Sequence, residues 1–133
     1  MPKKRKKKRG SRYHRGVYTS VKNDGKKFSY RSGWEGKYFD YLESDPDVVT
    51  YDYECIKIPY VSNKKSGRTR NYIPDFMVTR PSGIEIIEIK PTRFLKKRAI
   101  VKKLAAGHEY ATSHNMTFKL LTEVELKAMS LID

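Results

Sequence analysis

The fold is decided by residues 72–91, which read YIPDFMVTRPSGIEIIEIKP. Residues 73–79 are apolar and β-branched enough for a strand, and residues 81–83 (Pro-Ser-Gly) are typical of a tight turn. Residues 84–90 then form a second apolar run that is rich in isoleucine. This pattern predicts two neighbouring strands joined as a hairpin.

Such a hairpin places three charged side chains together. Asp75 lies near the start of the first strand and Glu88 near the end of the second, and these ends are adjacent in an antiparallel pair. Side chains alternate between the two faces of a strand, so Glu88 and Lys90 share one face. The plain alternative is that both belong to an ordinary solvated face. A carboxylate in this isoleucine-rich run is costly to bury without a partner, which favours a site.

Two carboxylates and a lysine suit metal-dependent chemistry on a phosphate. Mg²⁺ prefers oxygen ligands, keeps several waters and also takes phosphate oxygens. It polarises a scissile phosphate and lowers the pKa of a bound water. The sequence therefore predicts a Mg²⁺ site at Asp75 and Glu88, with Lys90 orienting the water or stabilising the developing charge.

The chain has 133 residues and a formal net charge of +14, which indicates one domain with an affinity for polyanions. Residues 1–15 hold nine basic residues and no acidic one, and the remainder carries a net charge of +5. Nucleic acid is the default partner for this balance. We expect residues 1–12 to form a disordered basic arm and residues 13–133 to form a single domain. The arm also fits a nuclear localisation signal, so its role stays open between DNA binding and targeting.

Cys55 is the single cysteine, so one chain can form neither a disulfide framework nor a cysteine-based zinc site. It lies in an apolar run, where we expect a buried filler in a reducing compartment. No apolar run approaches the length of a membrane span, and no apolar core follows the basic N-terminus as in a secretory signal. These observations predict a cytoplasmic protein that does not contact membranes.

Residues 32–44 are predicted to form the first helix. Ser32 is followed three residues later by Glu35, which is the spacing of a capping box. Glu35 therefore has two interpretations: it caps its own helix, or it points toward Asp75 and Glu88 as a third carboxylate. Apolar residues recur at helical spacing and predict the buried stripe, which comprises Trp34, Tyr38, Phe39 and Leu42.

The segments around this helix are less regular. Residues 13–31 interleave aromatic and basic residues, which fits either contact with nucleic acid or a flap packed on the core. Residues 48–61 are predicted to form one long strand, in which Pro59 indicates an edge strand or a bend near its end. Glu54 on this strand is either a residue of the polar face, which we favour, or a lesser candidate ligand. Residues 62–71 are predicted to form a polar, basic hairpin loop that either reaches the DNA backbone or is merely solvated.

The C-terminal part completes an α/β pattern. We expect a helix over residues 95–112, a strand over 116–121 and a short final helix with a capping box from Thr122 to Glu125. The predicted fold has the order α-β-β-β-α-β-α and a mixed sheet of about four strands flanked by helices. The predicted inner face of the long helix comprises Ile100, Val101, Leu104, Ala105 and His108.

Five short segments resemble signatures of a known superfamily. They are YRSGWE at 30–35, IPY at 58–60, IPDF at 73–76 and IEIKP at 87–91, with the YHRG opening at 13–16. In this order they resemble the PD-(D/E)xK, or restriction-endonuclease-like, superfamily. Within it the sequence is similar to head-completion nucleases of large tailed phages and to the N-terminal domain of TnsA-type transposon endonucleases. TnsA-type proteins carry a further DNA- or partner-binding domain without a counterpart here, so we expect the phage type.

The resemblance implies a restriction-endonuclease-like core and a metal-dependent DNA endonuclease. It implies Glu35, Asp75 and Glu88 as metal ligands, with the backbone carbonyl of Ile89 as a further ligand, and Lys90 as the catalytic lysine. Mg²⁺ is the implied cofactor and Mn²⁺ the expected substitute. For the phage type, the implied substrate is packaged double-stranded DNA, and the implied partners are the portal and other head or neck proteins. The implied locations are the host cytoplasm and the virion, and a dimer is compatible with the superfamily.

The predicted DNA-binding residues are basic side chains of the arm, of the segment before the first helix and of the start of the long helix. They are Lys3, Lys4, Arg5, Lys6, Lys7, Lys8, Arg9, Arg12, Arg15, Arg31, Lys96, Lys97 and Arg98. Two alternative functions remain open. A non-catalytic DNA-binding or structural virion protein needs these cations but none of the four site residues. An RNA- or ribosome-associated protein rests on charge alone.

Overall fold

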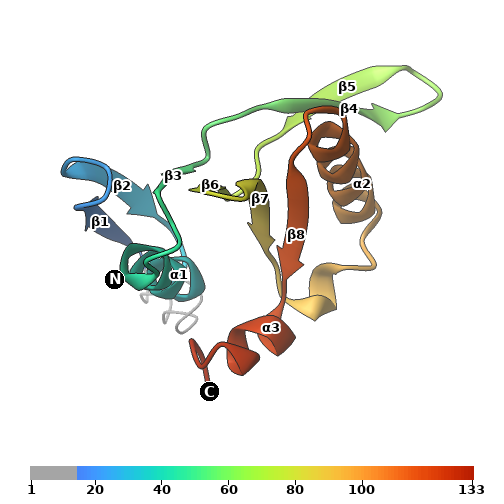
Figure 1. The fold of residues 1–133 in the computed structure, drawn as a ribbon. Helices are drawn as coiled ribbons and strands as arrows, with labels where there is room; N and C mark the ends of the chain where they lie inside the picture. Colours follow the sequence, from blue (N-terminus) through green and yellow to red (C-terminus); the bar gives the residue numbers. More distant parts are fainter. Residues whose placement is uncertain (1–14) are drawn as a thin grey trace, which may run out of the picture.

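The computed structural model describes residues 15–133, in which a four-stranded mixed sheet lies at the centre (Figure 1). The strand order is β3-β6-β7-β8, with β3–β6 and β6–β7 antiparallel and β7–β8 parallel. The strands are β3 (Thr50–Tyr53), β6 (Phe76–Arg80), β7 (Gly83–Ile89) and β8 (Thr117–Leu121). The predicted four-stranded mixed sheet and the hairpin within residues 72–91 are therefore confirmed.

Two helices cover opposite faces of this sheet: α1 (Gly33–Ser44) and α2 (Arg98–Ser113) (Figure 1). The predicted stripe of α1 faces the sheet, because Tyr38, Phe39 and Leu42 are at most 2% exposed and pack on Phe76. Trp34 is only partly buried against the same cluster. On the other face, α2 packs on β7 and β8 as the crossover between these two parallel strands.

Two hairpins stand outside the sheet, so the predicted order, with four strands, lacked four of the eight strands that the structure describes. The first is β1 (Gly16–Ser20) with β2 (Lys26–Tyr30), and its aromatic side chains pack on α1. The ring centroids of Tyr18 and Phe28 lie 5.1 and 5.4 Å from that of Phe39. Of the two interpretations of residues 13–31, the described part is thus a flap packed on the core.

The prediction of one strand over residues 48–61 is wrong. The chain leaves the sheet at Glu54, whose φ of +49° lies in the left-handed region and whose N–H donates to the Asp75 carbonyl at 2.9 Å. After this turn, β4 (Ile58–Asn63) pairs with β5 (Arg68–Tyr72) as the second hairpin, so residues 68–72 are strand rather than loop. Cys55 lies at the turn and is exposed, which corrects the expectation that it is buried.

The predicted start and inner face of the long helix also need correction. Pro91 is followed by the 3₁₀ turn η2 (Thr92–Phe94), and α2 begins only at Arg98. Val101 is 52% exposed, and Ala105 and His108 are exposed as well. The residues that face the sheet lie on the neighbouring helical stripe, which comprises the half-buried Ile100 and Leu104 and the buried Gly107 and Ala111.

The C-terminal helix α3 (Glu123–Ala128) follows β8 directly. The capping box between Thr122 and Glu125 is present in both directions, as predicted. Leu126 is fully buried and joins the cluster under α1. No helix among residues 15–133 combines the length and apolar character that a membrane span requires.

Candidate active site

Asp75 and Glu88 meet at the end of the β6–β7 hairpin. Phe76 pairs with Ile87, so the next position places Asp75 opposite Glu88. The carboxylate oxygen Oδ2 of Asp75 accepts a hydrogen bond from the Ile89 N–H at 2.8 Å, which closes the gap between the two strands. Both acids are buried, with 8% and 6% of their surface exposed. Local strand pairing thus fixes two carboxylates at one point inside the protein.

Glu88 is held from two sides. Its Oε1 accepts a hydrogen bond from the Tyr72 hydroxyl at 2.7 Å, and its Oε2 lies 3.7 Å from the Lys90 ammonium. Tyr72 ends β5 and is only 3% exposed. Its ring fits because α2 has no side chain at Gly107, where an added Cβ would lie 2.9 Å from the ring. The position of Glu88 therefore depends on a hairpin and a helix outside its own strand.

Glu35 approaches this pair from α1. Its Oε1 accepts hydrogen bonds from the Arg31 N–H at 3.0 Å and from the Tyr53 hydroxyl at 2.9 Å, and Glu35 is 8% exposed. Ser32 does cap the helix, because its hydroxyl accepts from the Glu35 N–H at 3.2 Å. In a full capping box the Glu35 carboxylate would accept a hydrogen bond from the Ser32 N–H. Here it accepts from Arg31 and Tyr53 instead, so the Glu35 carboxylate is not used to cap its helix.

In Asp75 and in Glu35, one carboxylate oxygen is tied to the fold and the other is less constrained. Oδ1 of Asp75 and Oε2 of Glu35 accept no hydrogen bond from the described residues. No fully buried side-chain nitrogen or oxygen atom in residues 15–133 lacks a hydrogen-bond partner. This arrangement orients the carboxylates while leaving oxygen atoms available for a ligand.

The three carboxylates perturb one another. Burial raises the pKa of Asp75 well above its usual range, and the nearby charges of Glu88 and Glu35 raise it further. Burial also raises the pKa of Glu88, with Glu35 adding to the rise, whereas the Tyr72 hydroxyl and the Lys90 charge oppose it. The charge of Lys90 opposes both shifts. The cluster therefore favours a bound proton or a further cation, as is common at functional sites.

The donor set fits Mg²⁺ with few protein ligands. Within residues 15–133, no three His, Cys, Asp or Glu side chains lie close enough together to surround one ion. Mg²⁺ does not require such a cage, because it usually binds one or two carboxylates and completes its shell with waters and substrate phosphates. Asp75 and Glu88 supply such a pair. The roles predicted for Glu35 and for the Ile89 carbonyl stay predictions.

The predicted DNA-binding residues are spread over several places. Lys3 to Arg12 lie outside the described residues. Arg15 and Arg31 line one open cavity of about 600 Å³, where Arg31 pairs with Glu54. Lys96 and Lys97 are exposed before α2, and Arg98 lines a different cavity on its first turn, described below.

Sequence reasoning missed the two tyrosines that hold the carboxylates, Tyr53 and Tyr72. A buried tyrosine needs a partner for its hydroxyl, and both stand in strand segments close to a candidate acid. A second missed signal is Gly107, because a glycine inside a helix is costly and usually has a packing reason. These signals mark residues that need partners without telling which partners they have.

Comparison with known proteins agrees with this geometry. Residues 45–123 match the family model described as TnsA-like endonuclease N terminal, which covers more than half of the chain. The chain is also 31% identical over 134 residues to the head completion nuclease of Enterobacteria phage T4, across 84% of this chain and 89% of that protein. The resemblance inferred from the motifs is thus confirmed. The chain belongs to the TnsA-like endonuclease N-terminal family, which is of the PD-(D/E)xK type, and is a distant relative of the phage T4 nuclease.

Proposed function

We propose that this protein is a Mg²⁺-dependent endonuclease that hydrolyses phosphodiester bonds of double-stranded DNA. The observation that carries the proposal is the convergence of Asp75, Glu88 and Lys90, with Glu35 close enough to raise the pKa of both buried acids. The central sheet with α1 and α2 is proposed to be the restriction-endonuclease-like core. Residues 1–12 are proposed to be a DNA-binding arm attached to it.

In this proposal each residue of the site has one task. Asp75 and Glu88 hold Mg²⁺, with Glu35 and the Ile89 carbonyl as further ligands directly or through water. When bound, Mg²⁺ polarises the scissile phosphate and lowers the pKa of a coordinated water. Lys90 orients the attacking water or balances the charge that develops on the phosphate. Tyr53 and Tyr72 fix the carboxylates and so reduce the reorganisation that the reaction requires.

The relative in phage T4 supplies the biological context of the proposal. We infer that the protein acts on packaged DNA during head completion, next to portal or neck proteins of a phage particle. Cleavage at transposon ends, which the resemblance to TnsA-type transposon endonucleases implies, is the second context. The basic cavity described below is compatible with both contexts, because each requires binding of the DNA backbone.

Plasmid cleavage with Mg²⁺ or Mn²⁺ tests the proposal. We expect nicking or linearisation by the wild type, and a loss of about 10³-fold or more in Asp75→Ala and Lys90→Ala, which remove a metal ligand and a charge from the site. Glu109→Gln is the matched control, since this carboxylate is exposed on α2 and makes no contact with the site. EDTA should abolish cleavage by the wild type and by the control.

Binding separates the possible failures of this test. A folded wild type that binds DNA but does not cleave it with either metal would contradict the proposed activity and favour a non-catalytic DNA-binding protein. Full cleavage by Asp75→Ala would place the active site elsewhere.

A further inference from the structure

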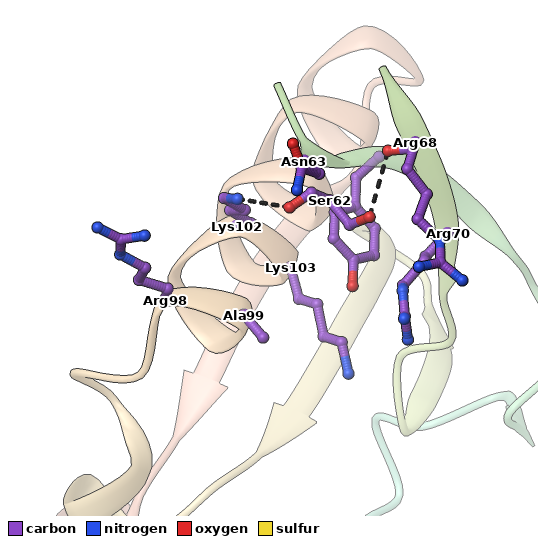
Figure 2. Close-up of a pocket in the computed structure, with 9 residues that line it drawn as sticks. Ser62, Asn63, Arg68, Arg70, Arg98, Ala99, Lys102 and Lys103 are labelled. Carbon is purple, nitrogen blue, oxygen red and sulfur yellow. Dashed lines mark hydrogen bonds between the residues drawn. The ribbon is translucent and has the colours of Figure 1, made fainter. Parts of the chain in front are cut away.

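A basic cavity lies between the β4–β5 hairpin and the first half of α2. It has a volume of about 400 Å³, and no acidic residue lines it. Five cations take part in its lining: Arg68 and Arg70 from β5, and Arg98, Lys102 and Lys103 from α2. Figure 2 shows Arg68, Arg70 and Lys103 extending toward the same side of the gap, whereas the Arg98 side chain extends away from them.

These cations are not neutralised by the protein. None of them forms an ion pair with a carboxylate of residues 15–133. Arg80 shows the opposite arrangement, because it pairs with Asp45, Asp47 and Glu85 at 3.0 to 3.1 Å. A cation that serves the fold is thus surrounded by acids here, whereas the cavity gathers like charges that repel one another. An external anion removes this repulsion.

The two walls of the cavity are tied together. The Lys102 ammonium donates a hydrogen bond to the Ser62 carbonyl at 2.7 Å, which fixes α2 against the hairpin (Figure 2). Lys102 therefore holds the walls, and the charged ends of the other cations remain available. Arg matches a phosphate through two parallel N–H bonds, and Lys adds a point charge.

The cavity is connected to the candidate active site by one strand. Arg68, Arg70 and Tyr72 occupy alternate positions of β5 and so share one face, about 6.8 Å apart from one to the next. The Tyr72 hydroxyl donates to Glu88 at 2.7 Å. The row of cations on β5 thus leads directly to a residue that contacts a proposed metal ligand.

We propose that this cavity binds the phosphate groups of a duplex DNA backbone beside the active site, without reading the base sequence. The inference rests on the proposed function in naming DNA as the ligand. Phosphate contacts fix the register of a protein on the duplex and carry no sequence information directly. The hairpin and α2 then form a clamp that guides one strand toward Glu88.

The first test introduces a carboxylate into the cavity without removing a contact. Ala99 is exposed on α2 and lines the cavity, whereas Ala105 is exposed on the same helix outside the lining. In EDTA and 0.1 M salt, Ala99→Glu should raise the Kd for a labelled duplex about tenfold. The new carboxylate neutralises one cavity cation and so costs one phosphate contact, and each contact contributes nearly one power of salt concentration to the Kd. Ala105→Glu should change the Kd less than about twofold.

The second test removes positive charge. The double variant Arg70→Gln/Lys103→Gln should reduce the slope of log K against log salt by about two, one for each lost phosphate contact. Lys64→Gln/Lys65→Gln is the matched control, because these lysines are exposed at the tip of the same hairpin and do not line the cavity. Thermal midpoints close to that of the wild type verify folding.

The outcomes separate this proposal from the proposed nuclease activity. Equal losses of DNA affinity in each variant and its matched control would overturn the cavity as a site. Poly-glutamate serves as a second polyanion for comparison: variants that lose affinity for poly-glutamate but keep their affinity for DNA would also overturn the proposal. If the wild type binds two duplexes of different sequence with unequal affinity, and this difference disappears in the cavity variants, recognition of the backbone alone would be contradicted. If the cavity variants lose DNA affinity while the wild type never cleaves with Mg²⁺, the cavity proposal stands and the nuclease proposal fails.

Discussion

The carboxylate site and the basic cavity are opposite in charge and in burial. Asp75 and Glu88 are at most 8% exposed and are bonded to the fold, with Lys90 as the nearby cation. The cavity holds five cations without a carboxylate, and Arg68, Arg70 and Arg98 among them are exposed. The first region fits a small divalent cation and the second fits a polyanion. One substrate complex, a metal ion on a DNA phosphate, satisfies both.

The difference in burial follows from what each region has to do. Catalysis gains from groups that are fixed before the reaction, which explains why each acid has a bonded oxygen and why two tyrosines are committed to them. Binding of a charged polymer gains from the sum of many contacts, so exposed and adaptable side chains suffice. The two regions share β5, whose cations lie at one end and whose Tyr72 lies at the other.

Among substitutions outside the charged residues of the site, the largest effect on this comparison is expected from Tyr72→Phe. Loss of the hydroxyl frees Glu88 and removes an interaction that lowers its pKa, so cleavage should fall about 10- to 100-fold and its pH profile should move to higher pH. Affinity for DNA in EDTA should stay unchanged. Tyr110→Phe, on the half-buried ring that stacks on His114, is the control. A pH profile that does not move, or a loss confined to DNA affinity, would contradict the role of Tyr72.

A smaller effect concerns stability. The folded protein raises the pKa of Asp75 above that of the unfolded chain, so metal-free stability is highest below the unfolded pKa and falls as pH rises through the folded pKa. Asp75→Asn keeps an oxygen for the Ile89 N–H and removes this loss. In EDTA at pH 8 we expect the thermal midpoint of the variant to lie a few degrees above that of the wild type. For a domain of this size, this shift corresponds to about 1 kcal/mol in the free energy of unfolding.

This stability gain has a clear signature in calorimetry. The gain should disappear below about pH 4, where the aspartate is protonated in both states. Saturating Mg²⁺ should stabilise the wild type more than the variant, since it binds the folded state. A variant less stable than the wild type at pH 8 in EDTA would contradict the cost assigned to the buried carboxylates.

Local patterns were enough to predict the elements that carry the site. The β6–β7 hairpin follows from two apolar runs and a turn within twenty residues, and α1 follows from its cap and its apolar spacing. Because strand alternation and hairpin pairing are local rules, the convergence of Asp75, Glu88 and Lys90 could be expected from the sequence.

The remainder depends on contacts between distant segments. The break at Glu54 is set by its bond to the Asp75 carbonyl, and a short apolar run gives no sign of that partner. The inner stripe of α2 is set by the close approach of other elements at Gly107. Local periodicity predicted this stripe on neighbouring residues instead. The basic cavity needs β5 and α2 side by side. Local patterns could therefore mark Arg98 as a DNA-binding residue but could not group it with Arg68 and Arg70 of the predicted hairpin loop.

The most direct test of the account measures single-turnover cleavage with Mg²⁺ at enzyme concentrations that saturate the DNA. Ala99→Glu should then cleave at the wild-type rate, because its defect lies in binding and excess enzyme overcomes it. Glu88→Gln should stay at least about 10³-fold slower, because its defect lies in the chemistry. This outcome would show that the carboxylate site and the basic cavity perform separate tasks. A slow Ala99→Glu at saturation, or an active Glu88→Gln, would contradict the account.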